Sequence, residues 1–432
     1  MSTARRNAER LGGASSDVAD TGRAAAGVAR IEWADRSMAV LGQIRARFAV
    51  TTPFAGMRIG CCMHVTAETA NLMRTLVAGG AEVALAASNP LSTQDDVAAA
   101  LATKYGVRVF ARAGVDLPTY YRHIGRVIDR RPHLVLDDAC DLITTLHATR
   151  TDVLRDVRAG CEQTTTGLLR LRAMAKAGAL RIPVVAVNST GTKQLFDNTY
   201  GTGQSTIDAI IRTTNTLLAG RTVVVAGYGF CGRGVASRAR GLGAAVIVTE
   251  IDPTKALDAT MNGFPVMPMS KAATQGDVFV TVTGNRDVIT GDHIEAMKDG
   301  ALLLNAGHFD VEIDVRWLDS NAVRANRGVR QHTDEYLLDN GRRVLLLAQG
   351  RVANLAAAEG HPPAVMDMTF ADQALTAGWL AQRSGELEAG VYDVPDDVDA
   401  EVARLKLGSL GVGIDALTDE QAHYLDSWDQ GS

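Results

Sequence analysis

Short apolar runs alternate with amphipathic stretches along residues 57–188. Apolar runs of four to eight residues are typical of buried strands, whereas apolar positions three and four residues apart are typical of helices. The expected strands are residues 57–63, 81–88, 107–111, 133–139 and 181–188, and the expected helices are 66–78, 95–106, 116–130 and 151–177. This alternation predicts a mainly parallel sheet covered by helices on both faces.

A second region begins at residue 221 and has a more specific pattern. A β-branched run at residues 222–226 is followed by three glycines, Gly227, Gly229 and Gly232. A helical segment (235–242), another apolar run (244–248) and the acidic residue Glu250 come next. The glycines allow a tight turn, a close approach of backbone to a pyrophosphate, and close packing of helix on strand. Glu250 can accept hydrogen bonds from both ribose hydroxyls and repels a 2′-phosphate, so the pattern predicts NAD rather than NADP.

The remaining segments extend these two regions. Residues 193–218 are expected to form a loop and then a long helix that enters the dinucleotide domain, and further strands are expected at 277–284 and 300–309. That domain is expected to end near Gly350, and residues 354–375 indicate a loop that enters a helix.

The composition excludes several classes of protein. The chain has 432 residues and a formal net charge of −5, which gives no basic footprint for nucleic acid. No apolar run approaches the length of a membrane span. The five cysteines form no Cys-x-x-Cys pair, which argues against a disulfide framework or a zinc site and favours a reducing compartment. We expect a cytoplasmic protein with no metal, nucleic-acid or membrane partner.

Polar residues gather at the carboxyl ends of the expected strands. His64 follows the first strand, Asp137 and Asp138 follow the fourth, and Asn188 and Lys193 follow the fifth. Functional residues of open parallel sheets lie at these ends. Each residue taken alone is more simply explained as a helix or turn cap, but five such groups facing a cofactor domain favour a functional site.

Eight separated motifs resemble the S-adenosylhomocysteine hydrolase family. They are HVTAET (64–69), NPLSTQDD (89–96), LDDACDL (136–142), EQTTTG (162–167), TKQLFDNTYGTGQS (192–205), GYGFCGRG (227–234), NAGHFDVEID (305–314) and NLAAAEGHP (354–362). The resemblance covers almost the full length, from about Ala29 to Trp428, and the short form of the chain is similar to archaeal and thermophile-type members.

This resemblance implies an α/β fold of two Rossmann-like, doubly wound parallel-sheet domains hinged around a cleft. It implies a discontinuous substrate-binding domain over residues 29–192 and 353–400, an NAD-binding domain over residues 193–352, and a C-terminal oligomerisation tail over residues 401–432. Residues 1–28 are expected to form a disordered tail, because they are rich in Ala, Arg, Gly and Ser and contain no apolar segment. Each subunit of a homotetramer would hold one NAD tightly. The reaction would convert S-adenosylhomocysteine to adenosine and homocysteine by oxidising the ribose 3′-hydroxyl, eliminating the 5′-thiolate, adding water and reducing the ketone again.

The resemblance also implies roles for individual residues. Lys193 with Asp197 would assist deprotonation of the 3′-hydroxyl, Asn198 would position Lys193 and the nicotinamide, and His64 and Asp138 would transfer protons at C4′ and C5′. Substrate-binding roles fall to Thr66, Glu68, Gln163, His308, His361 and Met366, with Glu68 accepting from an exocyclic amine. Cofactor-binding roles fall to Thr164, Thr165, Thr166, Asn198, Gly227, Gly229, Gly232, Glu250, Lys255, Ala306, Gly307, His308 and Asn354.

The chain departs from the family pattern at several positions. The family has Glu at Gln163, Asp at Ser189, Glu at Gln349, Asn at Asp372 and often Asn at Lys255. These differences leave two alternatives open: a nucleoside dehydratase or eliminase that uses the same redox chemistry on another nucleoside, and a non-catalytic NAD-binding regulator. The presence of His64, Asp138, Lys193 and Asp197 argues against the regulator.

Overall fold

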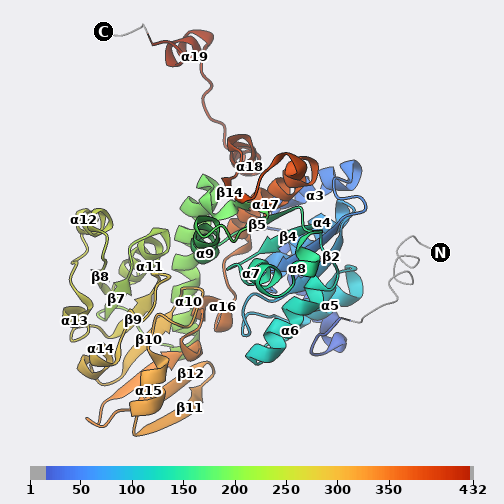
Figure 1. Ribbon diagram of the computed structural model, residues 1–432. Coiled ribbons are helices and arrows are strands. Elements are labelled where there is room, and N and C mark those ends of the chain that lie inside the picture. Colours follow the sequence, from blue (N-terminus) through green and yellow to red (C-terminus); the bar gives the residue numbers. More distant parts are fainter. Residues whose placement is uncertain (1–15, 429–432) are drawn as a thin grey trace.

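Residues 16–428 are described by a computed structural model, and they form two lobes that are each built on a seven-stranded sheet (Figure 1). The predicted class, α/β with two Rossmann-like domains, is confirmed. In the described part of the chain no helix is both long and apolar enough to cross a membrane.

The first lobe holds an entirely parallel sheet in the order β14-β6-β5-β4-β1-β2-β3. Its strands are β1 (Arg58–Cys62), β2 (Glu82–Ala86), β3 (Arg108–Phe110), β4 (Leu134–Asp137), β5 (Ala159–Glu162), β6 (Pro183–Ala186) and β14 (Gly390–Asp393). The chain runs outward from β1 to β3 and then returns to place β4 on the other side of β1. This reversal leaves a crevice beyond the carboxyl ends of β1 and β4, where open parallel sheets bind their ligands.

Helices cover both faces of this sheet, each over its own apolar cluster. One face carries α2 (Ala24–Asp35), α3 (Ala39–Thr51), α4 (Ala67–Ala78), α5 (Asp95–Lys104), α17 (Pro363–Arg383) and α18 (Asp396–Ser409). The other face carries α6 (Leu117–Ile128), α7 (Asp141–Ala148), α8 (Thr151–Leu154) and α9 (Thr165–Lys176). The strands are therefore buried on both sides, which explains their continuous apolar runs.

The second lobe has the sheet order β11-β12-β13-β10-β9-β7-β8, in which only the pairs that include β12 are antiparallel. Its strands are β7 (Thr222–Ala226), β8 (Ala245–Thr249), β9 (Val278–Thr281), β10 (Ala301–Asn305), β11 (Arg324–Arg330), β12 (Thr333–Leu337) and β13 (Arg343–Leu347). One face is covered by α10 (Thr202–Thr214), α11 (Phe230–Gly241), α12 (Pro253–Met261) and α16 (Ala353–Ala356), and the other by α13 (Met269–Ala272), α14 (Gly291–Ala296) and α15 (Val315–Asn321).

Short elements lie between the longer ones and near both ends of the described chain. They are η1 (Thr21–Arg23), η2 (Val187–Ser189), η3 (Lys193–Gly201), η4 (Ala348–Gly350), η5 (Ser384–Glu386) and α19 (Asp419–Leu425). The π-helical η3 leads from the first lobe into α10, and the chain returns to the first lobe through α17, whose successor β14 pairs with β6. Figure 1 shows α19 held away from both lobes at the end of an extended segment.

The prediction of a single helix over residues 151–177 is wrong. The structure has α8, the strand β5 and α9 there, and β5 is fully buried between β4 and β6. The sequence of β5, Ala-Gly-Cys-Glu, is too short and too poor in β-branched residues to interrupt a helical pattern visibly. The expected loop at the start of residues 193–218 is likewise helical from Lys193, and α11 begins at Phe230 rather than at residue 235.

Both expected tails differ from the structure where it describes them. Residues 1–15 lie outside the described residues, but residues 21–28 form η1 and the start of α2. Gly27 packs so closely on α5 that a Cβ there would lie 1.9 Å from the carbonyl oxygen of Asp96. The boundary expected after residue 400 falls inside α18, whose Val402 is buried in the core of the first lobe, and residues 429–432 lie outside the described part.

Candidate active site

A cavity of about 190 Å³ lies between the carboxyl ends of the first-lobe strands and the second lobe. Most of the residues predicted from the sequence line it. They are His64, Thr66, Glu68, Asp138, Gln163, Thr164, Thr165, Thr166, Lys193, Asp197, Asn198, Ala306, Gly307, His308, Asn354, His361 and Met366. The cavity therefore joins residues that are far apart in the sequence, as expected for a site at a topological switch point.

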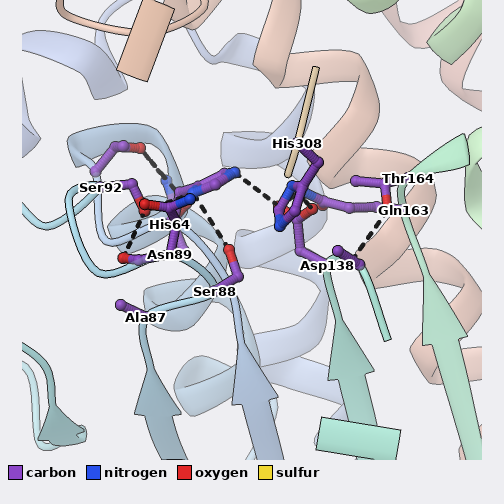
Figure 2. A network of polar contacts seen from close by, with 12 residues as sticks. His64, Ala87, Ser88, Asn89, Ser92, Asp138, Gln163, Thr164 and His308 are labelled. Atoms are coloured by element: carbon purple, nitrogen blue, oxygen red, sulfur yellow. Dashed lines mark hydrogen bonds and ion pairs between the residues drawn. The ribbon is translucent and has the colours of Figure 1, made fainter. Parts of the chain in front are cut away.

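One side of the cavity, here called the strand-end wall, consists of His64, Asp138 and Gln163 (Figure 2). The side-chain amide of Gln163 donates from Nε2 to Asp138 Oδ2 at 2.8 Å. His64 Nε2 lies 3.4 Å from the same oxygen, and His308 Nδ1 lies 3.6 Å from Asp138 Oδ1. Asp138 Oδ1 itself is buried and has no hydrogen-bond partner within the described residues. Oδ2 of Asp138 is thus committed to the Gln163 amide and lies beside His64, whereas Oδ1 faces His308 without a hydrogen bond.

His64 is held in place from behind by hydroxyl groups. Its Nδ1 lies 2.6 Å from Ser92 Oγ and 3.2 Å from Ser88 Oγ. Burial lowers the pKa of His64 to about 4, although the Asp138 carboxylate acts in the opposite direction. Below neutral pH the imidazole therefore stays uncharged down to about pH 4, and it can both accept and donate a proton in the working range.

The opposite side, here called the helix wall, consists of Lys193, Asp197 and Asn198 on η3. Lys193 Nζ donates to Asn198 Oδ1 at 2.5 Å and lies 3.3 Å from Asp197 Oδ2. Asp197 Oδ1 lies 2.5 Å from Nδ1 of His361, and Thr369 donates to Asp197 Oδ2 at 2.6 Å. The wide turns of η3 direct both members of the Lys193–Asp197 pair toward the cavity.

The negative charge of Asp197 is held by its neighbours. Burial acts to raise the pKa of Asp197, but Lys193 and His361 outweigh it and hold that pKa well below its usual range. Asn198 in turn donates to Asn188 at 3.2 Å, and Asn188 donates to Thr165 at 3.0 Å. This chain of side chains ties the lysine to β6 and α9 of the first lobe.

Two buried carboxyls lie directly behind Asp138. Glu162 Oε1 accepts from the main-chain N–H of Ala139 at 3.0 Å, and Asp137 Oδ1 accepts from that of Asp138 at 3.0 Å. Burial raises the pKa of Asp137 to about 7, and burial together with the charges of Asp137 and Asp138 raises that of Glu162 further. Ala139 and Cys140 have φ of 80° and 67°, so these carboxyls hold a turn that non-glycine residues rarely adopt.

Two groups in this region have the spacing of metal ligands. The donor atoms of His64, Asp138 and His308 lie within 4.8 Å of one another, as do those of Asp137, Cys140 and Glu162. Burial raises the pKa of the Cys140 thiol far above its usual value, which disfavours the thiolate that a metal requires. Gln163 already donates a hydrogen bond to Asp138, so His64, Asp138 and His308 are better suited to acid–base work than to chelation.

The glycine-rich turn after β7 has the geometry that a dinucleotide needs. Gly227 has φ of 100°, and a Cβ on Gly232 would lie 2.0 Å from the carbonyl oxygen of Gly227. A Cβ on Gly229 would meet no atom within 4 Å, which leaves its backbone open to a close ligand. Because α11 begins immediately afterwards, its free N–H groups favour an anion at this turn. The residues present therefore fit the pyrophosphate of NAD.

Glu250 lies at the end of β8, beside this turn. Its Oε2 accepts from the main-chain N–H of Tyr228 at 2.7 Å, and its Oε1 accepts from that of Ile251 at 2.7 Å. Oε1 also accepts from the main-chain N–H of Asp252 at 3.1 Å, so Oε2 is the oxygen with capacity for a further bond, such as one from a ribose hydroxyl. Lys255, on the exposed first turn of α12, lies 3.5 Å from Asp252. Glu250, Lys255 and the three glycines do not line the cavity, so a dinucleotide would span the distance between that turn and the walls.

Sequence reasoning did not include several cavity residues. They are Thr69, Leu169, Thr202, Cys231, Thr283, Gly284, Val352, Leu355 and Phe370, whereas Asn188, which also lines the cavity, was among the expected strand-end groups. Thr283 and Gly284 follow β9 and donate their main-chain N–H groups to Glu312, so a polar pair after a strand was the available signal. The apolar residues carried no such signal because any core position has the same pattern.

A larger hollow of about 990 Å³ lies in the second lobe, away from both walls. Gln349 lines this hollow and not the cavity, and it shares an unusual left-handed conformation with Ala348, at φ of 58° and 48°. The large hollow contains ion pairs of Arg327 with Asp319 and Asp334, and no acid–base group faces it from the first lobe. We therefore place the candidate site at the smaller, buried cavity.

Comparisons with known proteins show the family of this chain. The sequence pattern of the S-adenosyl-L-homocysteine hydrolase family matches residues 15–158, and that of its NAD-binding domain matches residues 198–360. Adenosylhomocysteinase of Aquifex aeolicus is 58% identical over 96% of this chain and 99% of its own, and that of Saccharolobus solfataricus is 53% identical over 96% and 99%. S-inosyl-L-homocysteine hydrolase of Methanosarcina mazei is 54% identical over 93% and 97%. This chain belongs to the S-adenosyl-L-homocysteine hydrolase family and is an NAD-binding hydrolase.

Proposed function

We propose that this protein hydrolyses S-adenosyl-L-homocysteine to adenosine and homocysteine. The observation that carries the proposal is that two different sets of acid–base residues line one cavity, in a chain whose second lobe has a glycine turn that fits a dinucleotide. The names of its relatives favour this reaction over the dehydratase alternative. The steps below assign the work of each wall.

The cofactor would be held by the turn at Gly227 and Gly229, by Glu250 at the adenosine ribose, and by Thr164–Thr166, Asn198 and Asn354 near the cavity. Asn354 supports this assignment because its Oδ1 is buried without a partner while its Nδ2 donates to Ser205. When bound, NAD supplies a reversible hydride acceptor for the 3′-carbon of the substrate.

The helix wall would act on the 3′-oxygen. An amine at Lys193 Nζ can take the hydroxyl proton and then donate it back as a hydrogen bond to the carbonyl oxygen of the 3′-ketone. Asp197 and Asn198 hold Nζ at that place, because both lie within 3.3 Å of it. A positive charge here also favours the enolate that forms after proton loss at C4′.

The strand-end wall would move the protons at C4′ and C5′. Asp138 Oδ1 has no partner, so it is the oxygen that can take the C4′ proton. The electrons of the C4′–H bond then form the C4′–C5′ double bond, the C5′–S bond breaks, and the leaving thiolate takes the proton that Asp138 removed from C4′. Water adds to C5′ by the reverse of these transfers, with the wall returning the proton to C4′.

The base would be held by Thr66, Glu68 and Met366 at one end of the cavity. Burial raises the pKa of Glu68, but its carboxylate can still accept from the exocyclic amine of adenine, which inosine lacks. Because the M. mazei relative is named for S-inosyl-L-homocysteine, the base of this chain's substrate has two candidates, adenine and hypoxanthine. We propose adenine because the Glu68 carboxylate would be repelled by the carbonyl oxygen of hypoxanthine, which is also a hydrogen-bond acceptor.

A direct assay tests the substrate. The purified protein is incubated separately with the S-adenosyl and S-inosyl substrates, and released thiol and nucleoside are measured. We expect kcat/KM to favour the adenosyl substrate by at least about tenfold, since one charged hydrogen bond contributes about 1.5–3 kcal/mol. Glu68→Gln should reduce this preference, with Glu359→Gln, a change at an exposed carboxylate, as the control. Release of a dehydrated nucleoside without thiol would contradict hydrolysis.

We also infer that the protein assembles as a homotetramer through its C-terminal tail and works in the cytoplasm. The tail supports this because Leu410, Val412, Ile414, Leu417 and Leu425 are exposed apolar residues, and α19 has no other packing partner among the described residues. Burying such residues against a second copy would stabilise the assembly. Light scattering tests it: removal of residues 410–432 should lower the mass to that of a smaller species, and an unchanged mass would refute the tail's role.

A further inference from the structure

A buried carboxyl on α17 stands outside the two walls but contacts the turn that carries Lys193. Asp372 is fully buried, and its Oδ2 lies 3.0 Å from Thr190 Oγ1 and 2.7 Å from Thr192 Oγ1. No main-chain N–H donates to this carboxyl within the described residues, and its Oδ1 has no partner. A carboxylate left this way in an apolar helix interface is unfavourable.

A count of hydrogens shows where a proton must lie. Thr192 Oγ1 contacts two carboxyl oxygens, Oδ2 of Asp372 and Oδ1 of Asp399, but a hydroxyl has one hydrogen and can donate to only one of them. The second contact is a hydrogen bond only if one carboxyl donates to the hydroxyl. Without such a proton, two negative oxygens would share a single donor.

The surroundings assign this proton to Asp372. Asp399 accepts two main-chain hydrogen bonds, from Gly191 at 2.8 Å and from Thr192 at 3.1 Å, and it is partly exposed to solvent. Asp372 has neither amide donors nor solvent. Burial, followed by the Asp399 charge, raises the pKa of Asp372 to about 8.

We propose that Asp372 is a positioning residue that works as a neutral carboxylic acid, donating to Thr192, which donates to Asp399, so that the turn before Lys193 is held by one continuous set of hydrogen bonds. The main-chain N–H of Lys193 completes the turn by donating to Thr190 Oγ1 at 3.2 Å. The turn is thereby fixed between α17 and α18, the two helices that return to the first lobe after the second.

The role follows from what loss of the proton would do. A charged Asp372 would face Asp399 across one hydroxyl, and repulsion would loosen residues 190–192 and shift Lys193. The other charged groups on the packed elements already have partners: Asp367 on α17 pairs with Lys406 on α18, and Asp197 on η3 pairs with Lys193. Asp372 is therefore the group of this interface that can switch the turn, and activity that depends on it is present below about pH 8 and lost above it.

The matched test is Asp372→Asn, because an amide keeps the donor to Thr192 and cannot ionise. The part of the proposal that concerns Lys193 rests on the proposed function, whereas the proton itself is measured without substrate. Asp137 and Glu162 also have raised pKa values, so the proton on Asp372 is read from an infrared difference spectrum. At pH 7, the spectrum of the full-length wild type minus that of Asp372→Asn should contain the carbonyl band of one protonated carboxylic acid. A difference spectrum without this band would overturn the proposal, even if the hydrolase assay succeeds.

Two further readouts separate positioning from simple packing. Asp372→Asn should keep turnover within about twofold of the wild type at pH 7. At pH 9 its turnover should exceed that of the wild type by about tenfold, because a group with a pKa near 8 is protonated in only about a tenth of the wild-type molecules there. Its melting temperature should rise relative to the wild type between pH 5 and 8, because only the wild type binds an extra proton in the folded state there. Asp372→Leu, which has no donor, should lose turnover at both pH values. Parallel pH profiles for the wild type and Asp372→Asn, or loss of turnover in a folded Asp372→Asn, would overturn the role.

Discussion

Both walls of the cavity place an aspartate beside a nitrogen base, but the two aspartates differ in their partners. In the helix wall, Lys193 and Asp197 neutralise each other, and the low pKa of Asp197 keeps its charge constant over the whole working range. In the strand-end wall, His64 is neutral and Asp138 has one oxygen without a partner. The comparison indicates that the helix wall holds a constantly charged carboxylate beside the lysine that acts on the 3′-oxygen, whereas the strand-end wall keeps an unpartnered oxygen for the protons at C4′ and C5′.

The backbone supports this division. The helix wall lies on consecutive turns of one element, η3, so its three residues keep their spacing whatever the lobes do. The strand-end wall takes its residues from the ends of β1, β4 and β5, whose parallel register brings them together. Fixed charge thus comes from local sequence, and proton transfer comes from the tertiary fold.

The largest effect should come from breaking the helix wall. Lys193→Ala removes the group at the 3′-oxygen and leaves Asp197 as an unpaired buried charge, so we expect kcat to fall by about 10³–10⁴-fold. Because the first oxidation should fail, no reduced-nicotinamide absorbance should appear when substrate is added in a single turnover. Lys271→Ala, on the exposed face of α13, is the control and should leave kcat unchanged. Wild-type reduction in Lys193→Ala would refute the assignment of this wall.

Breaking the strand-end wall should stop the reaction later. Asp138→Asn keeps the shape but cannot take the C4′ proton, so we expect turnover to fall by about 10²–10³-fold. The 3′-carbon should still be oxidised, and reduced-nicotinamide absorbance should build up and persist. Exchange of the C4′ proton with solvent deuterium, followed by mass spectrometry, should be lost at the same time. Undiminished exchange would assign the base to another group.

Much of this picture could be predicted from the sequence, and the parts that could not share physical causes. The residues after β1 and β4 were recognisable because polar side chains follow buried strands, and the glycine turn was recognisable because its spacing is demanded by backbone geometry. The strand β5 was not recognisable, since its four residues, Ala-Gly-Cys-Glu, give neither a β-branched run nor a period. The donor role of Gln163 and the proton on Asp372 could not be predicted either, because both depend on which side chains meet across the fold.

Gln163 offers the finest test of the comparison, since its amide can donate to Asp138 at every pH. In Gln163→Glu, the introduced carboxyl would lie beside Asp138, and two carboxyls at 2.8 Å must share a proton. At low pH that proton replaces the amide hydrogen, so the variant should approach wild-type turnover. As the pH rises through the pKa of the pair, the proton leaves, Asp138 loses its donor, and the ratio of wild-type to variant kcat should grow to about tenfold.

The control for this change is Gln163→Met, which has similar length and no donor. It should lower turnover by a similar factor at all pH values, because its defect does not titrate. Measuring kcat for the three proteins from pH 5 to 9 separates the two cases: a pH-dependent ratio for Gln163→Glu beside a constant ratio for Gln163→Met supports a strand-end wall whose free oxygen is selected by Gln163. A ratio for Gln163→Glu that stays below about twofold throughout would mean that Asp138 does not depend on this donor, and that the wall moves its protons through the histidines alone.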